Sequence, residues 1–252
     1  MLIGSMNNPK NPLPKEIKWI KKNFDFLDLT LELPNSHPDK VHVRAVRELI
    51  DDFPVVGHTA WYLPIGSPFK ELRLYALSEL EKCVEVFRKL GVEKVNVHFD
   101  DSIPLIKDEH TIEFNIWSLQ RLVRIGKRHG VKIMAENTPG LFSQPGVLDK
   151  VFRKVPELML HLDIGHANIS TKNSTPILIA KFSKHLAHIH ISDNNGKKDE
   201  HLSLGKGNIN WPGMLGVVKD AGYDGTITLE VFTSEKTRVA DKPKLRKIWD
   251  NL

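Results

Sequence analysis

Short apolar runs rich in β-branched residues alternate with longer amphipathic stretches along the whole chain. This alternation is typical of a parallel sheet whose strands are joined by crossover helices. The apolar runs predict eight strands, at residues 2–6, 24–33, 53–60, 94–99, 131–138, 158–166, 186–193 and 226–232. The amphipathic stretches predict helices at residues 14–23, 38–52, 69–90, 109–129, 145–154, 174–184, 211–221 and 235–251.

Eight such pairs in 252 residues match the (β/α)8 TIM barrel in number and in size. Gly91, Gly130 and Gly222 stand where predicted helices turn back into strands, as helix C-caps require. An open doubly wound sheet is the alternative, but no G-x-G-x-x-G motif follows the first predicted strand. We therefore expect an α/β protein with a single TIM barrel domain over residues 1–252.

The composition is that of an ordinary globular protein, with 40% hydrophobic and 27% charged residues. The net charge of +5 is spread over helical stretches, which indicates solvated helix faces rather than a nucleic-acid footprint. We find no signal peptide and no window of about 18 apolar residues that could cross a bilayer. The lone Cys83 is expected to fill a helix core and suits a reducing compartment. We expect a cytoplasmic protein without membrane contacts, and the sequence is compatible with a homo-oligomer.

Residues suited to chemistry gather at the C-terminal ends of the predicted strands, where TIM barrels carry their active sites. They are Glu32, His58, His98, Glu136, Asp163, His166, His190, Asp193 and Glu230, joined by Asp199 and His201 in the loop after the seventh strand. A charge at the end of a buried strand is costly unless it is paired or bound to a metal. Glu136 and Glu230 each end an apolar run, so they carry the strongest signal. Imidazoles and carboxylates without thiolates suit Mn, Co, Zn or Fe in an open site.

Two further histidines, His161 and His188, are expected to point away from this set, because they alternate with Asp163 and His190 along their strands. The remaining five histidines lie in loop or helix patterns and are expected to face solvent. Trp61, just past His58, is a candidate for the wall of a pocket.

The chain resembles the xylose-isomerase-like barrel superfamily, which joins sugar phosphate isomerases and epimerases to the endonuclease IV group. The resemblance rests on the ordered series GHT, VHF, AENT, LDIGH, HIHISD, DEHLSLGKGNINW and LEVF. In the epimerase branch it implies one divalent metal ion held by four residues, namely Glu136, Asp163, His190 and Glu230. It also implies that Glu136 and Glu230 act as acid and base on opposite faces of a sugar carbon, through a metal-bound cis-enediolate. His166 then contacts a substrate hydroxyl, and we place Glu32, His58, Trp61, His98 and His201 in the same substrate pocket.

The endonuclease IV branch implies a different centre, with up to three zinc ions and cleavage at abasic sites in DNA. Its additional ligands match His58, His98, His166, Asp199 and His201. The short loops after the strands, and Lys206 in place of the Glu of a G-E-G turn, depart from that branch. A barrel that only binds a ligand, without catalysis, is a third hypothesis. The two carboxylates at apolar strand ends, Glu136 and Glu230, argue against it, because a binding protein has little reason to keep such costly charges.

We therefore expect a metal-dependent isomerase or epimerase that acts on a small sugar, sugar phosphate or polyol. Nucleic acid is a partner only in the endonuclease hypothesis.

Overall fold

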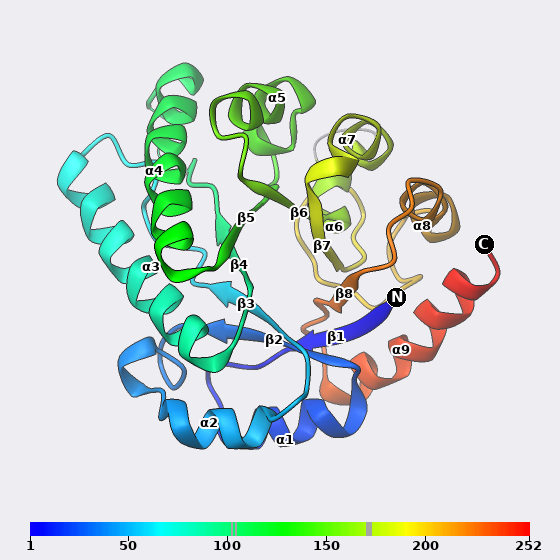
Figure 1. Cartoon of the computed structure of the whole chain (residues 1–252). Helices are drawn as coiled ribbons and strands as arrows, with labels where there is room; N and C mark the ends of the chain where they lie inside the picture. Colours follow the sequence, from blue (N-terminus) through cyan, green and yellow to red (C-terminus); the bar gives the residue numbers. More distant parts are fainter. Residues whose placement is uncertain (102, 104, 170–172) are drawn as a thin grey trace.

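Eight parallel strands form a closed barrel in chain order, with β8 paired to β1, in a computed structural model that describes residues 1–101, 103, 105–169 and 173–252 (Figure 1). This confirms the predicted (β/α)8 barrel. The strands are β1 (Leu2–Met6), β2 (Phe26–Leu31), β3 (Val55–Thr59), β4 (Lys94–His98), β5 (Lys132–Glu136), β6 (Met159–Asp163), β7 (Leu186–Ile191) and β8 (Thr226–Leu229).

Helices surround the barrel, and the termini lie on one side of it, where α9 runs beside β1 and β8 in Figure 1. The α-helices are α1 (Leu13–Asn23), α2 (Val43–Ile50), α3 (Lys70–Leu90), α4 (Asp108–His129), α5 (Pro145–Lys154), α6 (Ile164–Asn168), α7 (Thr175–Phe182), α8 (Trp211–Asp220) and α9 (Glu235–Asp250). Short 3-10 helices in the described residues are η1 (Pro38–Lys40), η2 (Leu141–Ser143) and η3 (Ser183–His185). Helices α3 and α4 end on Gly91 and Gly130 in the left-handed conformation, as the sequence predicts.

The main hydrophobic core lies between the barrel and its helices. Because side chains alternate along a strand, every second residue points outward. On β2 these are Leu27, Leu29 and Leu31, and on β6 they are Leu160 and Leu162, all at most 1% exposed. The helices contribute their apolar stripes to the same core, among them the buried Cys83 of α3.

The inside of the barrel has a different composition. At the N-terminal end of the strands, Phe26, Val56, Met134 and Ala187 form a small separate apolar cluster that closes the interior. Gly4 of β1 leaves room for the ring of Phe26, because a Cβ atom there would overlap that ring. Above this cluster the inward side chains are mostly polar, with Met6 of β1 as an apolar exception, and they lead to the functional site.

The main difference from the predicted elements follows Asp163, where a strand was expected to run to residue 166. The chain instead enters α6 at Ile164, because the Asp163 side chain accepts a 2.7 Å hydrogen bond from the backbone N–H of His166 and caps the helix. The predicted strands also extend past the observed ends of β5, β7 and β8.

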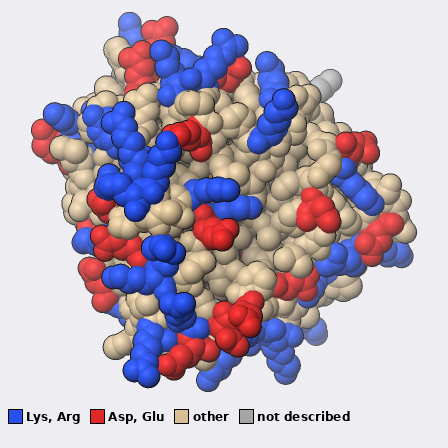
Figure 2. All heavy atoms as spheres, in the orientation of Figure 1, with Lys and Arg blue, Asp and Glu red and all other residues tan. Residues whose placement is uncertain are grey.

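Charges of both signs are interspersed on the face shown in Figure 2, where Asp and Glu side chains lie among those of Lys and Arg. This agrees with the expected solvated helix faces. Within the described part of the chain, no helix is long and apolar enough to span a bilayer.

Candidate functional site

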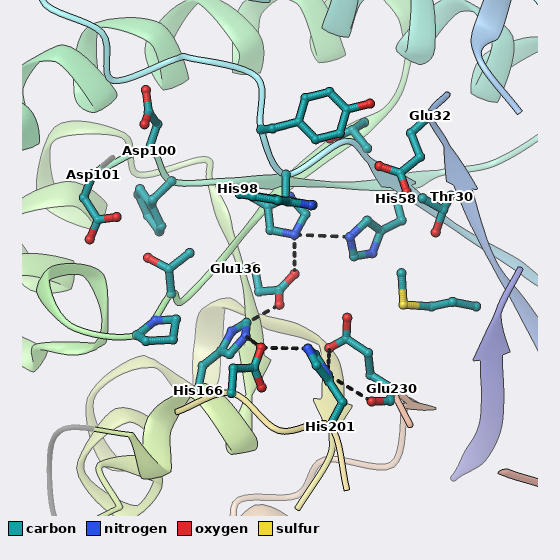
Figure 3. A pocket seen from close by; sticks show the side chains of 18 of the residues that line it. Thr30, Glu32, His58, His98, Asp100, Asp101, Glu136, His166, His201 and Glu230 are labelled. Carbon is teal, nitrogen blue, oxygen red and sulfur yellow. Dashed lines mark hydrogen bonds and ion pairs between the residues drawn. The ribbon is translucent and has the colours of Figure 1, made fainter. Parts of the chain in front are cut away.

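Register between neighbouring strands brings the predicted residues side by side at the C-terminal end of the barrel. His98 of β4 lies opposite Glu136 of β5, and Asp163 of β6 lies opposite His190 of β7. Glu230 directly follows β8, and its backbone N–H bonds to the carbonyl of Ile191. Parallel strands therefore collect side chains from distant segments into one cluster (Figure 3).

The centre of the cluster is a group of four buried residues, Glu136, Asp163, His190 and Glu230. One ligand atom from each lies within 4.8 Å of the other three. Nδ1 of His190 is 3.2 Å from Oε2 of Glu230, and Oδ2 of Asp163 is buried without a hydrogen-bond partner. Three buried carboxylates this close repel one another unless a cation lies between them. The donor set and the unpartnered oxygen both fit a divalent metal ion such as Mn, Co, Zn or Fe.

A second group adjoins the first through Glu136. His58 Nε2 lies 3.2 Å from His98 Nε2, and His98 Nε2 lies 3.0 Å from Glu136 Oε2 (Figure 3). One ligand atom from each of these three residues lies within 4.8 Å of the other two. The structure thus brings His58 and His98 into contact with the central group.

A third group closes the other side of the cluster. Asp199 Oδ2 lies 3.2 Å from His166 Nε2 and 2.7 Å from His201 Nε2. His166 Nδ1 lies 3.4 Å from Glu136 Oε1, and His201 Nδ1 lies 3.8 Å from Glu230 Oε2. All nine residues that the sequence pointed to as ligands therefore belong to one connected network.

The acid–base properties of the network reflect its packed charges. Burial alone would raise the pKa of the Glu136 carboxyl, but the nearby imidazoles, His161 first among them, hold it well below its ordinary value. Burial, reinforced by the neighbouring carboxylates, raises the pKa of Asp163 to about 7. Burial lowers the pKa of the His190 imidazole, yet the carboxylates of Glu230 and Asp28 together outweigh burial and keep that pKa well above its ordinary range. Because metal ligands must be deprotonated, a metal ion bound here would displace protons.

A cavity of about 950 Å³ opens above the network. Its walls include all six residues that the sequence assigns to a substrate pocket, which are Glu32, His58, Trp61, His98, His166 and His201. Trp61 is 69% exposed, so it lies at the rim. Glu32 is partly buried, which raises the pKa of its carboxyl. Glu136 and Glu230 line the cavity, whereas Asp163 and His190 are not among its lining residues and are completely buried.

The expectation for His161 and His188 is wrong. Residues two apart on a strand share a face, so both rings point inward with Asp163 and His190. The ring centroids of His161 and His190 are 4.0 Å apart, and His161 Nδ1 is 3.3 Å from Glu136 Oε2. His188 Nε2 is 3.2 Å from Oδ2 of Asp28.

Asp193, a predicted strand-end candidate, has a structural role. Its carboxylate accepts hydrogen bonds from the backbone of Gly205, from the backbone of Ile209 and from the indole N–H of Trp211. It thereby holds the glycine-rich turn after β7, and Lys206 of that turn is exposed.

Two inward residues of this interior were missed. Asp28 interrupts the apolar run of β2, which is the same signal that singled out Glu136, and it is completely buried. Asn96 of β4 donates a 2.6 Å hydrogen bond from Nδ2 to Glu136 Oε2 and so helps to orient that carboxylate. A polar residue at an inward position of a predicted strand was the available clue for both.

Comparison with known proteins places this chain in a family. Residues 17–248 match the family described as xylose isomerase-like TIM barrel. L-Ribulose 3-epimerase of Methylomonas sp. (strain DH-1) is 31% identical over 264 residues, covering 92% of this chain and 82% of that protein. A probable endonuclease 4 of Aquifex aeolicus (strain VF5) is 28% identical over 246 residues, covering 84% and 83%. A D-tagatose 3-epimerase-like protein of known crystal structure superposes with a TM-score of 0.88 at 26% identity, covering 100% of this chain and 98% of the other. The chain therefore belongs to the xylose isomerase-like TIM barrel family.

Proposed function

We propose that the protein is a divalent-metal-dependent epimerase or isomerase that acts on a small uncharged sugar. The observation that carries this proposal is the position of Glu136 and Glu230. Both carboxylates line the cavity, and both belong to the buried four-residue group whose ligand atoms lie within 4.8 Å of one another. Similarity to L-ribulose 3-epimerase and to a D-tagatose 3-epimerase-like protein supports the same reaction class.

The two glutamates are proposed to move protons at the sugar carbon next to the carbonyl. One carboxylate removes a proton from that carbon, and the other returns a proton to its opposite face, which inverts the configuration. A divalent cation, when bound, supplies a Lewis acid that stabilises the negative charge developed on the sugar. Asp163 and His190 would hold the cation from behind, because they are absent from the cavity wall.

The charge of the cavity favours an uncharged sugar over a sugar phosphate. Its lining includes six carboxylates, those of Glu32, Asp100, Asp101, Glu136, Asp199 and Glu230, and no Lys or Arg among the residues that the structure describes. Figure 3 shows Glu32 on one side of the cavity and Asp100 and Asp101 on the other. A phosphate dianion entering between them would meet no guanidinium or ammonium group on the described wall to bind it. The aromatic side chains of Trp61, Tyr62, Phe99 and Phe232 instead suit the apolar faces of a sugar ring.

The test is turnover of a panel of ketoses by Glu136→Gln and Glu230→Gln, each loaded with metal. Loss of a positioned acid or base should lower turnover by about a hundredfold or more in each variant. Glu48→Gln, which changes an exposed carboxylate of α2, is the matched control and should keep wild-type turnover. Circular dichroism checks that each variant is folded. Retention of more than a small fraction of turnover by either cavity variant would contradict the assigned roles.

A zinc-dependent phosphodiesterase acting on abasic DNA is the second candidate. The connected network of nine histidine and carboxylate side chains favours it, as does the similarity to a probable endonuclease 4. Metal content separates the two candidates. About one tightly bound ion per chain supports the epimerase, whereas three zinc ions with nicking of an abasic duplex support the phosphodiesterase.

A further inference from the structure

One carboxylate lies beneath the candidate metal centre without lining the cavity. Asp28 of β2 is completely buried inside the barrel. Its Oδ2 atom is 2.7 Å from Nε2 of His190 and 3.2 Å from Nε2 of His188, and it accepts a 2.8 Å hydrogen bond from the hydroxyl of Thr228. Its other oxygen, Oδ1, lies 3.6 Å from Nδ1 of His58.

Two of these histidines face the candidate centre with their opposite nitrogens. His190 points Nδ1 at Glu230 Oε2, 3.2 Å away, within the four-residue group. His58 points Nε2 at His98 Nε2, 3.2 Å away, within the three-residue group (Figure 3). The two imidazoles are stacked, with centroids 5.3 Å apart and an interplanar angle of 19°. Asp28 therefore lies beside one histidine from each group, on the side of the ring whose nitrogen points away from the candidate centre.

The geometry matters because an imidazole binds a metal ion only through a nitrogen that carries no proton. A carboxylate that accepts the N–H of the other ring nitrogen fixes the tautomer and the ring orientation, and it raises the basicity of the ligating nitrogen. At 2.7 Å, the contact between Asp28 and His190 has the length of a charge-assisted hydrogen bond. This contact leaves Nδ1 of His190 directed at Glu230 of the four-residue group.

We propose that Asp28 is a positioning residue of the metal centre, which holds His190, and more weakly His58, with the ligating nitrogen toward the cavity. This role rests on the proposed metal-dependent function. It does not require that the substrate be a sugar.

The experiment measures the dissociation constant for Zn²⁺, by competition with a chromophoric chelator, in wild-type protein and in Asp28→Asn. Asparagine has nearly the same shape, but its Nδ2 can donate to His190 Nε2 and so shift the ring proton to Nδ1, the nitrogen proposed to bind the metal. We expect Zn²⁺ affinity to fall by about ten- to a hundredfold. Equal affinity in the two proteins would overturn the role of Asp28.

Thr228→Val is the matched control, because it removes a neutral hydrogen bond to the same carboxylate, together with a 3.1 Å contact to Nε2 of His188, and leaves the contact between Asp28 and His190 in place. A merely structural role for this buried cluster would weaken Zn²⁺ binding equally in both variants, and that result would also overturn the proposal. We expect a loss of no more than about threefold in Thr228→Val.

Neutron diffraction from a zinc-loaded crystal of the wild-type protein tests the same claim even if Asp28→Asn does not fold. The proposal expects a deuteron on Nε2 of His190 and zinc at Nδ1. A deuteron on Nδ1, or zinc bound directly between Asp28, His58 and His190, would overturn it. If the wild-type protein binds no Zn²⁺ tightly, the metal centre itself is contradicted, whereas tight binding unaffected by Asp28→Asn contradicts only the inference about Asp28.

Discussion

The two faces of the barrel strands have opposite compositions. Outward positions are almost uniformly aliphatic and pack against the helices, as in Leu160 and Leu162 of β6. Inward positions of the same strand are His161 and Asp163, which are equally buried but polar. TIM barrel interiors are usually filled by branched aliphatic side chains, whereas this inward face carries the polar side chains of the proposed metal centre. The comparison indicates that stability comes mainly from the outward face, and that the inward face is shaped for function.

The largest effect on stability is expected from Leu162→Ala, which opens a cavity in the outward layer. Leu162 is completely buried in the main core, and such truncations cost about 3 kcal/mol or more in the free energy of unfolding. Because Leu162 points away from the site, the Zn²⁺ affinity of the folded protein should not change. Denaturant unfolding and chelator competition measure the two quantities. A large loss of Zn²⁺ affinity in folded Leu162→Ala would contradict the claim that the outward face serves stability and the inward face serves function.

For Asp163, the inward neighbour of Leu162, we expect the converse: a loss of metal affinity without a loss of stability. Asp163→Asn removes a proposed ligand charge but keeps an oxygen that can accept the capping hydrogen bond from His166. We expect Zn²⁺ affinity to fall by about a hundredfold or more, since even indirect partners of metal ligands contribute ten- to a hundredfold. The free energy of unfolding of the metal-free protein should not fall, because Oδ2 of Asp163 is buried without a hydrogen bond. Marked destabilisation of the metal-free variant would show that the inward face also supports the fold.

A smaller effect is expected at the N-terminal end of the barrel, where Asp25 contacts Lys242, Arg246 and the backbone N–H of Ile3. Burial raises the pKa of this carboxyl, but those partners outweigh it and lower the pKa below 3.8. A carboxyl with a lowered pKa in the folded state stabilises the protein above its unfolded pKa, and this contribution is lost as the pH falls through the folded pKa.

Asp25→Asn should therefore cost about 1 kcal/mol at neutral pH, as a partly exposed ion pair does. The difference from wild type should disappear in acid, once Asp25 is protonated in the folded protein. Denaturant unfolding across the pH range measures this, and a difference that persists at low pH would contradict the assignment. Zn²⁺ affinity should stay unchanged, which sets this stabilising carboxylate apart from those at the other end of the barrel.

The outward face explains why the fold could be predicted from the sequence. Its aliphatic residues recur with the period of a strand or of a helix, so the eight strands and the surrounding helices follow from local pattern. Glycines at helix ends, such as Gly91, help to predict where each helix ends. Helix α6 was missed because it begins at a side-chain cap on Asp163, which hydrophobic periodicity does not reveal.

The site could be predicted in part, because charged residues that end apolar runs stand out against the pattern. Glu136 and Glu230 are such residues, and the nine-residue network follows from their neighbours and from family resemblance. Asp28 gives the same signal from the middle of a run, yet its partner His190 lies 162 residues away in the sequence, and only the closed barrel brings them together. His161 and His188 were placed on the wrong face by an error in strand parity.

The most direct test of the central claim is solvent exchange at the sugar carbon. Metal-loaded protein is incubated in D₂O with a panel of uncharged ketoses, and deuterium next to the carbonyl is followed by NMR. The account predicts that deuterium enters at least one ketose, that chelation stops the exchange, and that added metal restores it. Absence of exchange into every ketose by fully loaded protein, with nicking of abasic DNA by the same sample, would contradict it.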